Sequence, residues 1–313
     1  MKRVAALLAA ALLVTGLIGC GGGGAEPGAP EGATLVLDFQ PNAVHSGIYA
    51  AQANGYFENE GMDLHIQEPS STADSAKLLE TGRADFAVMD INDFGIARER
   101  GLDVFAIAAI VQCPLASVIT RDPTEIRTPA DLAGKTIGVT GVPSDDAVLD
   151  TVLRAGGVDP SDVHRVTIGF NAATDLAAGK VDAATAFWNA EGVQLQQQGI
   201  PVREFRVDDF GAPRYPELVV AARADGAGGL SDAFKRGLAR GYEQLGAQPG
   251  IALQNLLHEV PGLNPSDQAR QLQALSTGRA FSRDGDSVTS ELDPRSVELW
   301  HRWAQGSGLL NPG

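Results

Sequence analysis

An acid, an aromatic ring, an amide and an imidazole stand close together in the stretch LDFQPNAVHSG, at positions 37–47. The apolar residues before it predict a strand and those after it predict a helix, so the cluster lies at a strand-to-helix junction. Asn42 fits the N-cap of that helix, with Ala43 at N1 and His45 at N3. Acid–base catalysis by His45, a ligand cradle with Phe39 as one wall, and helix capping with core packing all remain open.

Three further junctions of strand and helix carry polar or aromatic clusters: DIND at 90–93, GVPSDD at 141–146 and FWNAEG at 187–192. Ligands of open α/β sheets bind beyond the carboxyl ends of the strands, so we expect the four junctions to face one cleft. The candidate ligand-binding residues at these junctions and at one later loop are Phe39, Asn42, His45, Asp90, Asn92, Pro143, Ser144, Asp145, Trp188, Asn189, Glu191 and Tyr215.

The FWNAEG junction indicates a flat heterocyclic ligand. A ring could stack on the indole of Trp188, an interaction worth roughly 1–3 kcal/mol, while the Glu191 carboxylate accepts hydrogen bonds from ring N–H or amino groups. Tyr215 could complete the aromatic wall. The alternatives are that Trp188 packs under a hinge, that Tyr215 belongs to the core, and that Glu191 only favours the N-terminus of its helix.

The GVPSDD turn offers free backbone N–H groups at a helix start, capped by Ser144 or Asp145, and such an end can bind an anion. The adjacent Asp145 and Asp146 oppose an anion, so we expect a neutral or donor-rich ligand group there. The turn lacks the glycine and lysine spacing of a nucleotide-binding P-loop.

Short β-like runs alternate with helical segments from Thr34 onward, which predicts an α/β fold with mixed, mostly parallel sheets flanked by helices. The expected strands are TLVLDF, MDLHIQ, ADFAVM, VFAIAAIV, ASVITR, KTIGVT, HRVTIG, VDAATAF, PVREFRV and ELVVAAR. From Leu230 onward the pattern is helical, with no expected strand.

An internal repeat predicts two lobes. ETGRADFAV and AAGKVDAAT share a turn glycine, a basic residue, an apolar residue and an aspartate before a strand. We expect residues 34–119 and 216–313 to form the first lobe, with the helical C-terminal segment, and residues 120–215 to form the second. The two chain crossings between the lobes would make a hinge.

The N-terminus has the features of an exported lipoprotein. Lys2 and Arg3 precede an apolar run that is too short for a membrane span, and the run ends in LIGC, similar to the bacterial lipobox. We expect a signal peptide at 1–19, a lipid on Cys20, and a flexible Gly/Pro-rich tether at 20–33. The globular part would then lie at the outer face of the cytoplasmic membrane.

Composition excludes several classes of function. The formal net charge of −15 argues against a nucleic-acid partner. Beyond Cys20 the only cysteine is Cys113, so the mature monomer cannot form an internal disulfide. The sequence has no GxSxG or HExxH motif and no Cys/His metal spacing, and only His45 of the five histidines falls at a strand-end junction. We expect neither catalysis nor a cofactor nor a metal.

Several of these stretches together resemble the thiamine-pyrimidine-precursor binding proteins of bacterial ABC importers, which are related to riboflavin-binding proteins. They are LDFQPNAVHSGIYAAQANGYFENEGMDLHI, LETGRADFAV, LAGKTIGVTGVPSDDAVLDTVL and FWNAEGVQL. The resemblance covers most of Thr34 to about Arg223. The chain departs from it at Phe39, where relatives often have tryptophan, so the stacking surface would be smaller.

The resemblance implies a two-lobed type II periplasmic binding fold that closes on its ligand by hinge motion. Carried over by position, Asn42, His45, the GVPSDD turn, Trp188 and Glu191 would line the cleft, and Glu191 would engage an aminopyrimidine edge. The implied partners are a small heterocyclic ligand, an ABC permease and its ATPase, and the membrane through Cys20. We expect a monomer.

Two alternatives accompany this interpretation. Riboflavin or another flat heterocycle could be the ligand, because related binding proteins use the same fold. An extracellular enzyme acting on a pyrimidine or pyridoxal compound is the alternative from another class, since the superfamily contains a fungal pyrimidine-forming enzyme. That chemistry needs a lysine and a histidine near FAVMDINDFG and cysteines near DDFGAPRYPEL, and this chain has none of these residues there.

Overall fold

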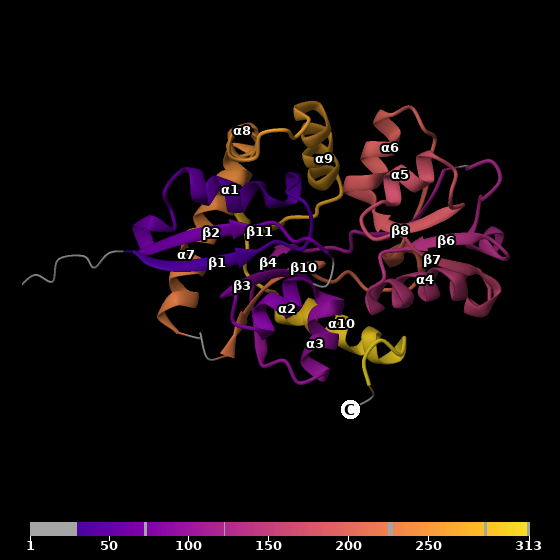
Figure 1. Ribbon diagram of the computed structural model, residues 1–313, viewed down its shortest axis with the longest axis horizontal. Coiled ribbons are helices and arrows are strands. Elements are labelled where there is room, and N and C mark those ends of the chain that lie inside the picture. The colour runs from indigo at the N-terminus through magenta and orange to yellow at the C-terminus, as the bar shows by residue number, and fades with distance from the viewer. Residues whose placement is uncertain (1–29, 72–73, 122, 225–227, 285–286, 312–313) are drawn as a thin grey trace, which may run out of the picture.

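The computed structural model describes residues 30–71, 74–121, 123–224, 228–284 and 287–311. Two five-stranded sheets lie side by side, each with helices on both faces (Figure 1). This arrangement confirms the predicted two-lobed α/β fold with mixed sheets. Parallel pairing does not predominate as expected, because each sheet has two parallel and two antiparallel pairings. The predicted signal peptide at 1–19 and the predicted lipid site at Cys20 lie outside the described residues.

The first sheet has the strand order β2-β1-β3-β10-β4. Its strands are β1 (Glu31–Val36), β2 (Met62–Gln67), β3 (Phe86–Asp90), β4 (Val104–Val111) and β10 (Leu218–Arg223). β1 is parallel to β2 and β3, whereas β10 is antiparallel to both of its neighbours, β3 and β4. A strand from late in the sequence therefore occupies an interior position.

The second sheet has the order β7-β6-β8-β5-β9. Its strands are β5 (Ala116–Thr120), β6 (Thr136–Val139), β7 (His164–Thr167), β8 (Ala183–Phe187) and β9 (Arg203–Arg206). β6 is parallel to β7 and β8, and β5 is antiparallel to β8 and β9. Each strand expected from the sequence thus has a counterpart in one of the two sheets.

Helices cover both faces of each sheet (Figure 1). Around the first sheet they are α1 (Ser46–Ala53), α2 (Asp74–Glu80), α3 (Ile91–Glu99), α7 (Gly229–Ala247), α8 (Pro249–Glu259), α9 (Pro265–Thr277) and α10 (Pro294–Gly306). Around the second they are α4 (Pro143–Ala155), α5 (Ala172–Ala177) and α6 (Val193–Gln197). The short helices are η1 (Ala43–His45), η2 (Glu58–Glu60), η3 (Pro129–Leu132), η4 (Pro160–Asp162), η5 (Trp188–Gly192) and η6 (Val207–Phe210). None of the helices within these described ranges is long and apolar enough to cross a membrane.

A close approach of α1 and α7 fixes the start of the first helical region. A Cβ atom on Gly241 would lie 2.0 Å from the carbonyl oxygen of Gly47, so only glycine allows this approach. The buried Tyr242 hydroxyl next to it donates a hydrogen bond of 2.9 Å to the carbonyl oxygen of Val44, within η1. α7 thereby holds in place the turn that follows β1.

The chain crosses between the sheets twice, at 112–115 between β4 and β5 and at 211–217 before β10. The predicted lobe boundary at 119/120 falls inside β5, which pairs with β8 and β9 of the second sheet. The predicted return at 215/216 lies within the second crossing. The division into lobes stays a prediction, and the strand pairing favours boundaries within the two crossings.

Two boundaries differ from expectation. The first strand begins at Glu31, inside the segment predicted as tether, because Glu31–Ala33 pairs in register with Met62–Leu64. The C-terminal region, expected to be helical throughout, also contains β11 (Ser282–Asp284) and β12 (Ser287–Thr289), which pair with each other. Strands of three residues are too short to show a hydrophobic alternation in the sequence.

Candidate ligand-binding cleft

A cavity of about 510 Å3 lies between the two lobes. All four strand-to-helix junctions singled out from the sequence contribute to its lining. The lining side chains that carry polar, charged or aromatic groups include Asp38, Phe39, Ser75, Asp90, Asp93, Thr140, Ser144, Phe170, Thr185, Phe187 and Glu191. The expected convergence of the four junctions on one cleft is therefore present in the structure.

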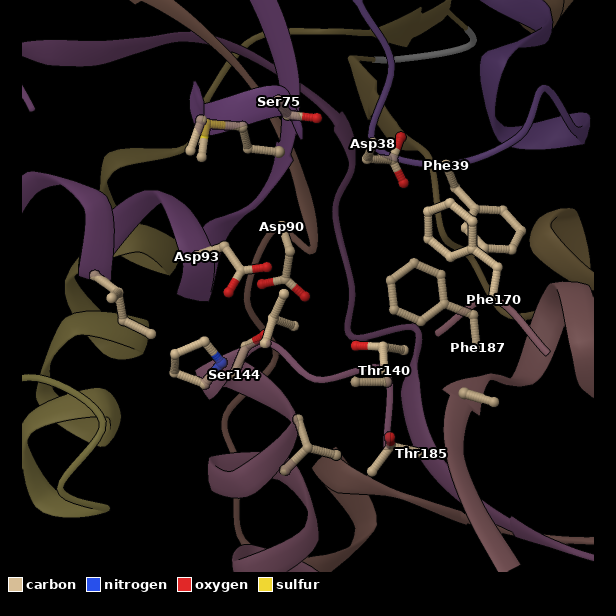
Figure 2. Close-up of a pocket in the computed structure, with 18 of the residues that line it drawn as sticks. Asp38, Phe39, Ser75, Asp90, Asp93, Thr140, Ser144, Phe170, Thr185 and Phe187 are labelled. Atoms are coloured by element: carbon tan, nitrogen blue, oxygen red, sulfur yellow. The ribbon is translucent and has the colours of Figure 1, made fainter. Parts of the chain in front are cut away.

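Three phenylalanine rings form one side of the cavity (Figure 2). Phe39 follows β1 in the first lobe, whereas Phe170 follows β7 and Phe187 ends β8 in the second lobe. Phe39 and Phe170 meet edge to face across the cleft, with ring centroids 4.5 Å apart and an interplanar angle of 78°. Together the three rings provide an apolar wall suited to a flat ligand.

Two carboxyl groups, those of Asp90 and Asp93, point into the cavity on the side opposite the rings (Figure 2). Asp90 is the N-cap of α3, and its Oδ1 accepts a hydrogen bond of 2.6 Å from the backbone N–H of Asn92. Burial raises the pKa of Asp90 well above its usual range, and the nearby Glu217 raises it further. Burial and the proximity of Asp90 likewise raise the pKa of Asp93.

A third carboxyl group comes from the second lobe. Glu191 lies in η5, and its Oε2 accepts a hydrogen bond of 3.1 Å from the backbone N–H of Phe187. Burial raises the pKa of Glu191. The contact with the end of β8 holds this carboxyl beside the aromatic wall.

The imidazole of His45 supports the cleft from behind. His45 is fully buried and does not belong to the lining. Its Nδ1 accepts a hydrogen bond of 3.2 Å from the backbone N–H of Asn42, so the ring proton is on Nε2. The Nε2–H group donates a hydrogen bond to Asp38 Oδ1, 2.9 Å away. His45 thus orients Asp38, whose carboxyl does line the cavity.

Three predicted site residues, Asn42, Asn92 and Asp145, do not line the cavity. Asn42 caps η1, accepting from the backbone N–H of Val44 at 3.1 Å. Asn92 is fully buried and accepts a hydrogen bond of 2.7 Å from the indole N–H of Trp300. Asp145 accepts from Thr140 at the end of β6 and braces the turn before α4. These three side chains hold backbone segments that carry lining residues.

The aromatic candidates also differ from expectation. Trp188 is only 3 % exposed, and its indole N–H donates 3.0 Å to the carbonyl oxygen of Pro114 in the first crossing. Its ring packs against Gly278 at the end of α9 and lies 4.1 Å from the guanidinium of Arg206. This position matches the alternative of packing at the hinge.

Two more candidates lie in the interior. Tyr215 is fully buried and stacks on Trp303, with centroids 5.5 Å apart, and Asn189 is fully buried as well. Of the predicted set, the residues in the lining are Phe39, Asp90, Pro143, Ser144 and Glu191.

Several lining residues were not anticipated from the sequence, notably Asp38, Asp93, Phe170 and Phe187. Asp38, Asp93 and Phe187 are direct neighbours of residues that were anticipated. Phe170 comes directly after the expected strand HRVTIG, which is not one of the four junctions singled out from the sequence. Its position after a strand end was the only feature of the sequence that indicated a place in the cleft.

The acid side of the cavity is connected to the chain crossings through Glu217. This fully buried residue ends the second crossing, and its Oε2 accepts hydrogen bonds from the backbone N–H groups of Leu115 at 2.6 Å and Ala116 at 3.3 Å. Its carboxyl lies near that of Asp90 and raises the pKa of Asp90. Burial raises the pKa of Glu217 to about 7.

The arrangement is suited to holding a ring against an apolar wall and accepting hydrogen bonds from its edge. The described residues contain no group of three or more His, Cys, Asp and Glu side chains placed to hold a metal ion. The ionisable side chains inside the cavity are acidic, whereas Lys77 and Arg100 are exposed at its rim.

Comparison with known proteins places these observations in a family. The sequence profile of the family described as NMT1/THI5 like matches residues 42–252. A formylaminopyrimidine-binding protein of Halalkalibacterium halodurans is 34% identical over 251 residues, covering 79% of this chain and 76% of that protein. A putative thiamine biosynthesis protein of Haemophilus influenzae is 30% identical over 238 residues, covering 74% of this chain and 75% of that protein. A 4-amino-5-hydroxymethyl-2-methylpyrimidine phosphate synthase of Saccharomyces cerevisiae is 28% identical over 179 residues, covering 56% of this chain and 52% of the enzyme.

Solved structures show the same fold at low sequence identity. The alkanesulfonate-binding protein SsuA of Xanthomonas axonopodis pv. citri superposes with a TM-score of 0.70 at 18% identity, covering 90% of this chain and 95% of that chain. The periplasmic nitrate-binding protein NrtA of Synechocystis PCC 6803 superposes with a TM-score of 0.67 at 12% identity, covering 91% of this chain and 83% of that chain.

Proposed function

The chain belongs to the NMT1/THI5-like family, and from this premise we propose that it is the solute-binding component of an ABC importer that captures an aminopyrimidine precursor of thiamine. The relative named as a formylaminopyrimidine-binding protein supports the ligand class. The fold, which is shared with periplasmic binding proteins, supports capture between two lobes.

One observation carries the proposal: the cavity between the lobes combines a wall of phenylalanine rings with carboxyl groups on the opposite side and at the edge of the wall. A pyrimidine would lie against Phe39, Phe170 and Phe187. Glu191, at the edge of this wall, would accept hydrogen bonds from the amino group and protonated edge of the ring. Closure of the lobes would exclude water and strengthen these contacts.

The hinge would consist of the two crossings, 112–115 and 211–217. Glu217 supports this role because it bonds the second crossing to the backbone N–H groups that follow the first. Trp188 supports it as well, since it connects η5 of the second lobe to Pro114.

Binding without chemical conversion is part of the proposal. The chain is also similar to pyrimidine phosphate synthases, which are enzymes. The segment FAVMDINDFG at 86–95 has no lysine or histidine, and DDFGAPRYPEL at 208–218 has no cysteine. The cavity instead presents carboxyl groups and phenylalanine rings at its centre.

We place the protein at the outer face of the cytoplasmic membrane, held by a lipid on Cys20 and a tether that ends before Glu31. A permease and an ATPase would be its partners, and it would act as a monomer. The lipobox-like LIGC at 17–20 supports this location.

A thermal-shift and calorimetric panel tests the ligand class. An aminopyrimidine present at a hundred times its Kd should stabilise the purified protein by about 2.7 kcal/mol, and should be recovered unchanged after binding. A shift with riboflavin but not with aminopyrimidines would replace the pyrimidine by a larger ring. Turnover of a pyrimidine or pyridoxal compound would overturn the binding-protein assignment.

A further inference from the structure

The chemical contrast between the inside of the cavity and its rim carries a more specific inference about the ligand. Inside, the ionisable groups are the carboxyls of Asp38, Asp90, Asp93 and Glu191. The basic side chains of the lining, Lys77 and Arg100, are exposed and lie at the rim together with the acidic Glu80. A ligand held against the phenylalanine wall therefore directs its opposite end toward the carboxyls of Asp90 and Asp93.

All four interior carboxyls have protein partners, and for Asp93 that partner is Ser144. Asp38 accepts from the His45 imidazole at 2.9 Å, and Glu191 accepts from the backbone N–H of Phe187 at 3.1 Å. Asp90 accepts from the backbone N–H of Asn92 at 2.6 Å. These contacts leave less of their acceptor capacity for a ligand.

Asp93 sits in the first turn of α3, one turn beyond the N-cap Asp90, and like Asp90 it directs its carboxyl into the cavity (Figure 2). Its neighbour across the cleft is Ser144, whose N–H and hydroxyl favour the charged form. A carboxylate offers about four acceptor sites, so Asp93 can still receive donors from a ligand.

We propose that Asp93, with Asp90 beside it, is the specificity-determining residue of the cleft: it selects pyrimidines with a cationic, N–H-donating substituent and excludes those that carry a phosphate. The inference rests on the proposed function and specifies which substituent of the pyrimidine the carboxyls of Asp90 and Asp93 recognise. An ammonium group between the two carboxyls gains charge-assisted hydrogen bonds. A phosphate brings no N–H donor to these carboxyls, and its negative charge repels any of them that is ionised.

The charged groups around Asp93 make binding of a cation dependent on pH. They are Asp90, Glu217 and Asp145 in the interior and Lys77, Glu80 and Arg100 at the rim. Burial and Asp90 raise the pKa of Asp93 in the empty site. A bound ammonium group lowers that pKa again, so binding releases protons and tightens as the pH rises through the raised pKa.

Calorimetric titration of the full-length protein with three matched ligands tests the inference. All three are 4-amino-2-methylpyrimidines, and ring carbon 5 carries an aminomethyl group, a hydroxymethyl group or a hydroxymethyl phosphate. We expect the aminomethyl compound to bind about tenfold more tightly than the hydroxymethyl compound, and the phosphate at least a hundredfold more weakly than either. Repeating the aminomethyl titration in buffers of different ionisation enthalpy should show net proton release.

The variant Asp93→Asn separates charge from shape. It should weaken binding of the aminomethyl compound about tenfold, change the hydroxymethyl compound less than threefold, and bind the phosphate more tightly than the wild type does. Asp63→Asn, at an exposed position on β2, is the matched control and should leave all three affinities unchanged. The ligand series on the wild-type protein tests the inference even where the variant does not fold.

Each outcome bears on a different statement. Equal affinity for the three pyrimidines, or unchanged selectivity in folded Asp93→Asn, overturns the role of Asp93 and leaves the proposed function standing. Binding of the phosphate as the preferred ligand also overturns it. Absence of binding by every pyrimidine overturns the proposed function and the inference together.

Discussion

The ring of Phe39 meets the ring of Phe170 edge to face, with centroids 4.5 Å apart, and so connects the loop after β1 to the loop after β7 across the cleft. These loops belong to different lobes and are far apart in sequence. A ligand that lies against both rings contacts both lobes at once. Closure of the two lobes and contact of both rings with the ligand therefore occur together.

Replacing either ring with alanine should weaken pyrimidine binding. A stacked aromatic contact is worth roughly 1–3 kcal/mol, so we expect Phe39→Ala and Phe170→Ala each to raise the Kd by about tenfold in calorimetric titration. Phe210→Ala is the matched control, because Phe210 packs on Phe205 outside the cavity. Unchanged affinity in folded Phe39→Ala would remove this ring from the site.

Glu191→Gln should weaken pyrimidine binding without unfolding the protein. Hydrogen bonds to charged groups contribute about 1.5–3 kcal/mol, so the Kd should rise roughly tenfold or more. Because burial raises the pKa of Glu191 in the folded state, its carboxyl contributes stability only at low pH. At pH 7 the melting temperature of the variant should not fall. Glu243→Gln, at an exposed position on α7, serves as the control.

Glu217 should make the free energy of unfolding depend on pH. Its pKa is raised from 4.5 to about 7, so its contribution is fully present below pH 4.5 and is lost as the pH rises to about 7. Urea denaturation of Glu217→Gln across this window should show a flatter pH dependence than the wild type. Parallel curves would contradict the raised pKa.

Glu217→Ala tests the structural role of the same residue at the hinge. The variant leaves the N–H groups of Leu115 and Ala116 without their acceptor. A buried donor without a partner costs about 1–3 kcal/mol. Urea denaturation should therefore show a loss of at least this size at every pH.

Trp188→Phe should reduce stability and leave affinity nearly unchanged. The variant loses the indole hydrogen bond to Pro114, and a net loss of about 1 kcal/mol or more is expected in urea denaturation. The Kd should stay within about twofold, because the ring packs at the hinge and lies outside the cavity lining. A Kd raised tenfold at unchanged stability would show that Trp188 contacts the ligand.

Much of the fold could be predicted because short apolar runs between turn residues mark buried strands. VFAIAAIV and ASVITR are interrupted only by QCPL, so they read as separate strands, and the structure assigns them to different sheets as β4 and β5. The sequence could not show where in this interval the chain leaves the first lobe. That depends on pairing with β8 and β9, which lie far along the chain.

The cleft could be located from the sequence more readily than its lining. Successive residues of a strand point to opposite faces, so the choice between Phe187 and Trp188 depended on where β8 ends and η5 begins. A step of one residue around a helix turns the side chain by about 100°, which separates the buried Asn92 from Asp93 in the cavity. In both cases the residue that lines the cavity is the direct neighbour of the predicted one.

The interior position of β10 in the first sheet orders the assembly of the molecule. β3 and β4 do not pair with each other and are connected in the sheet only through β10, residues 218–223. The strands of the second sheet, by contrast, all lie within residues 116–206. Because the chain is synthesised from its N-terminus, the second lobe can therefore fold while the first still lacks an interior strand. The hinge and the cleft come into existence only when β10 closes the first sheet.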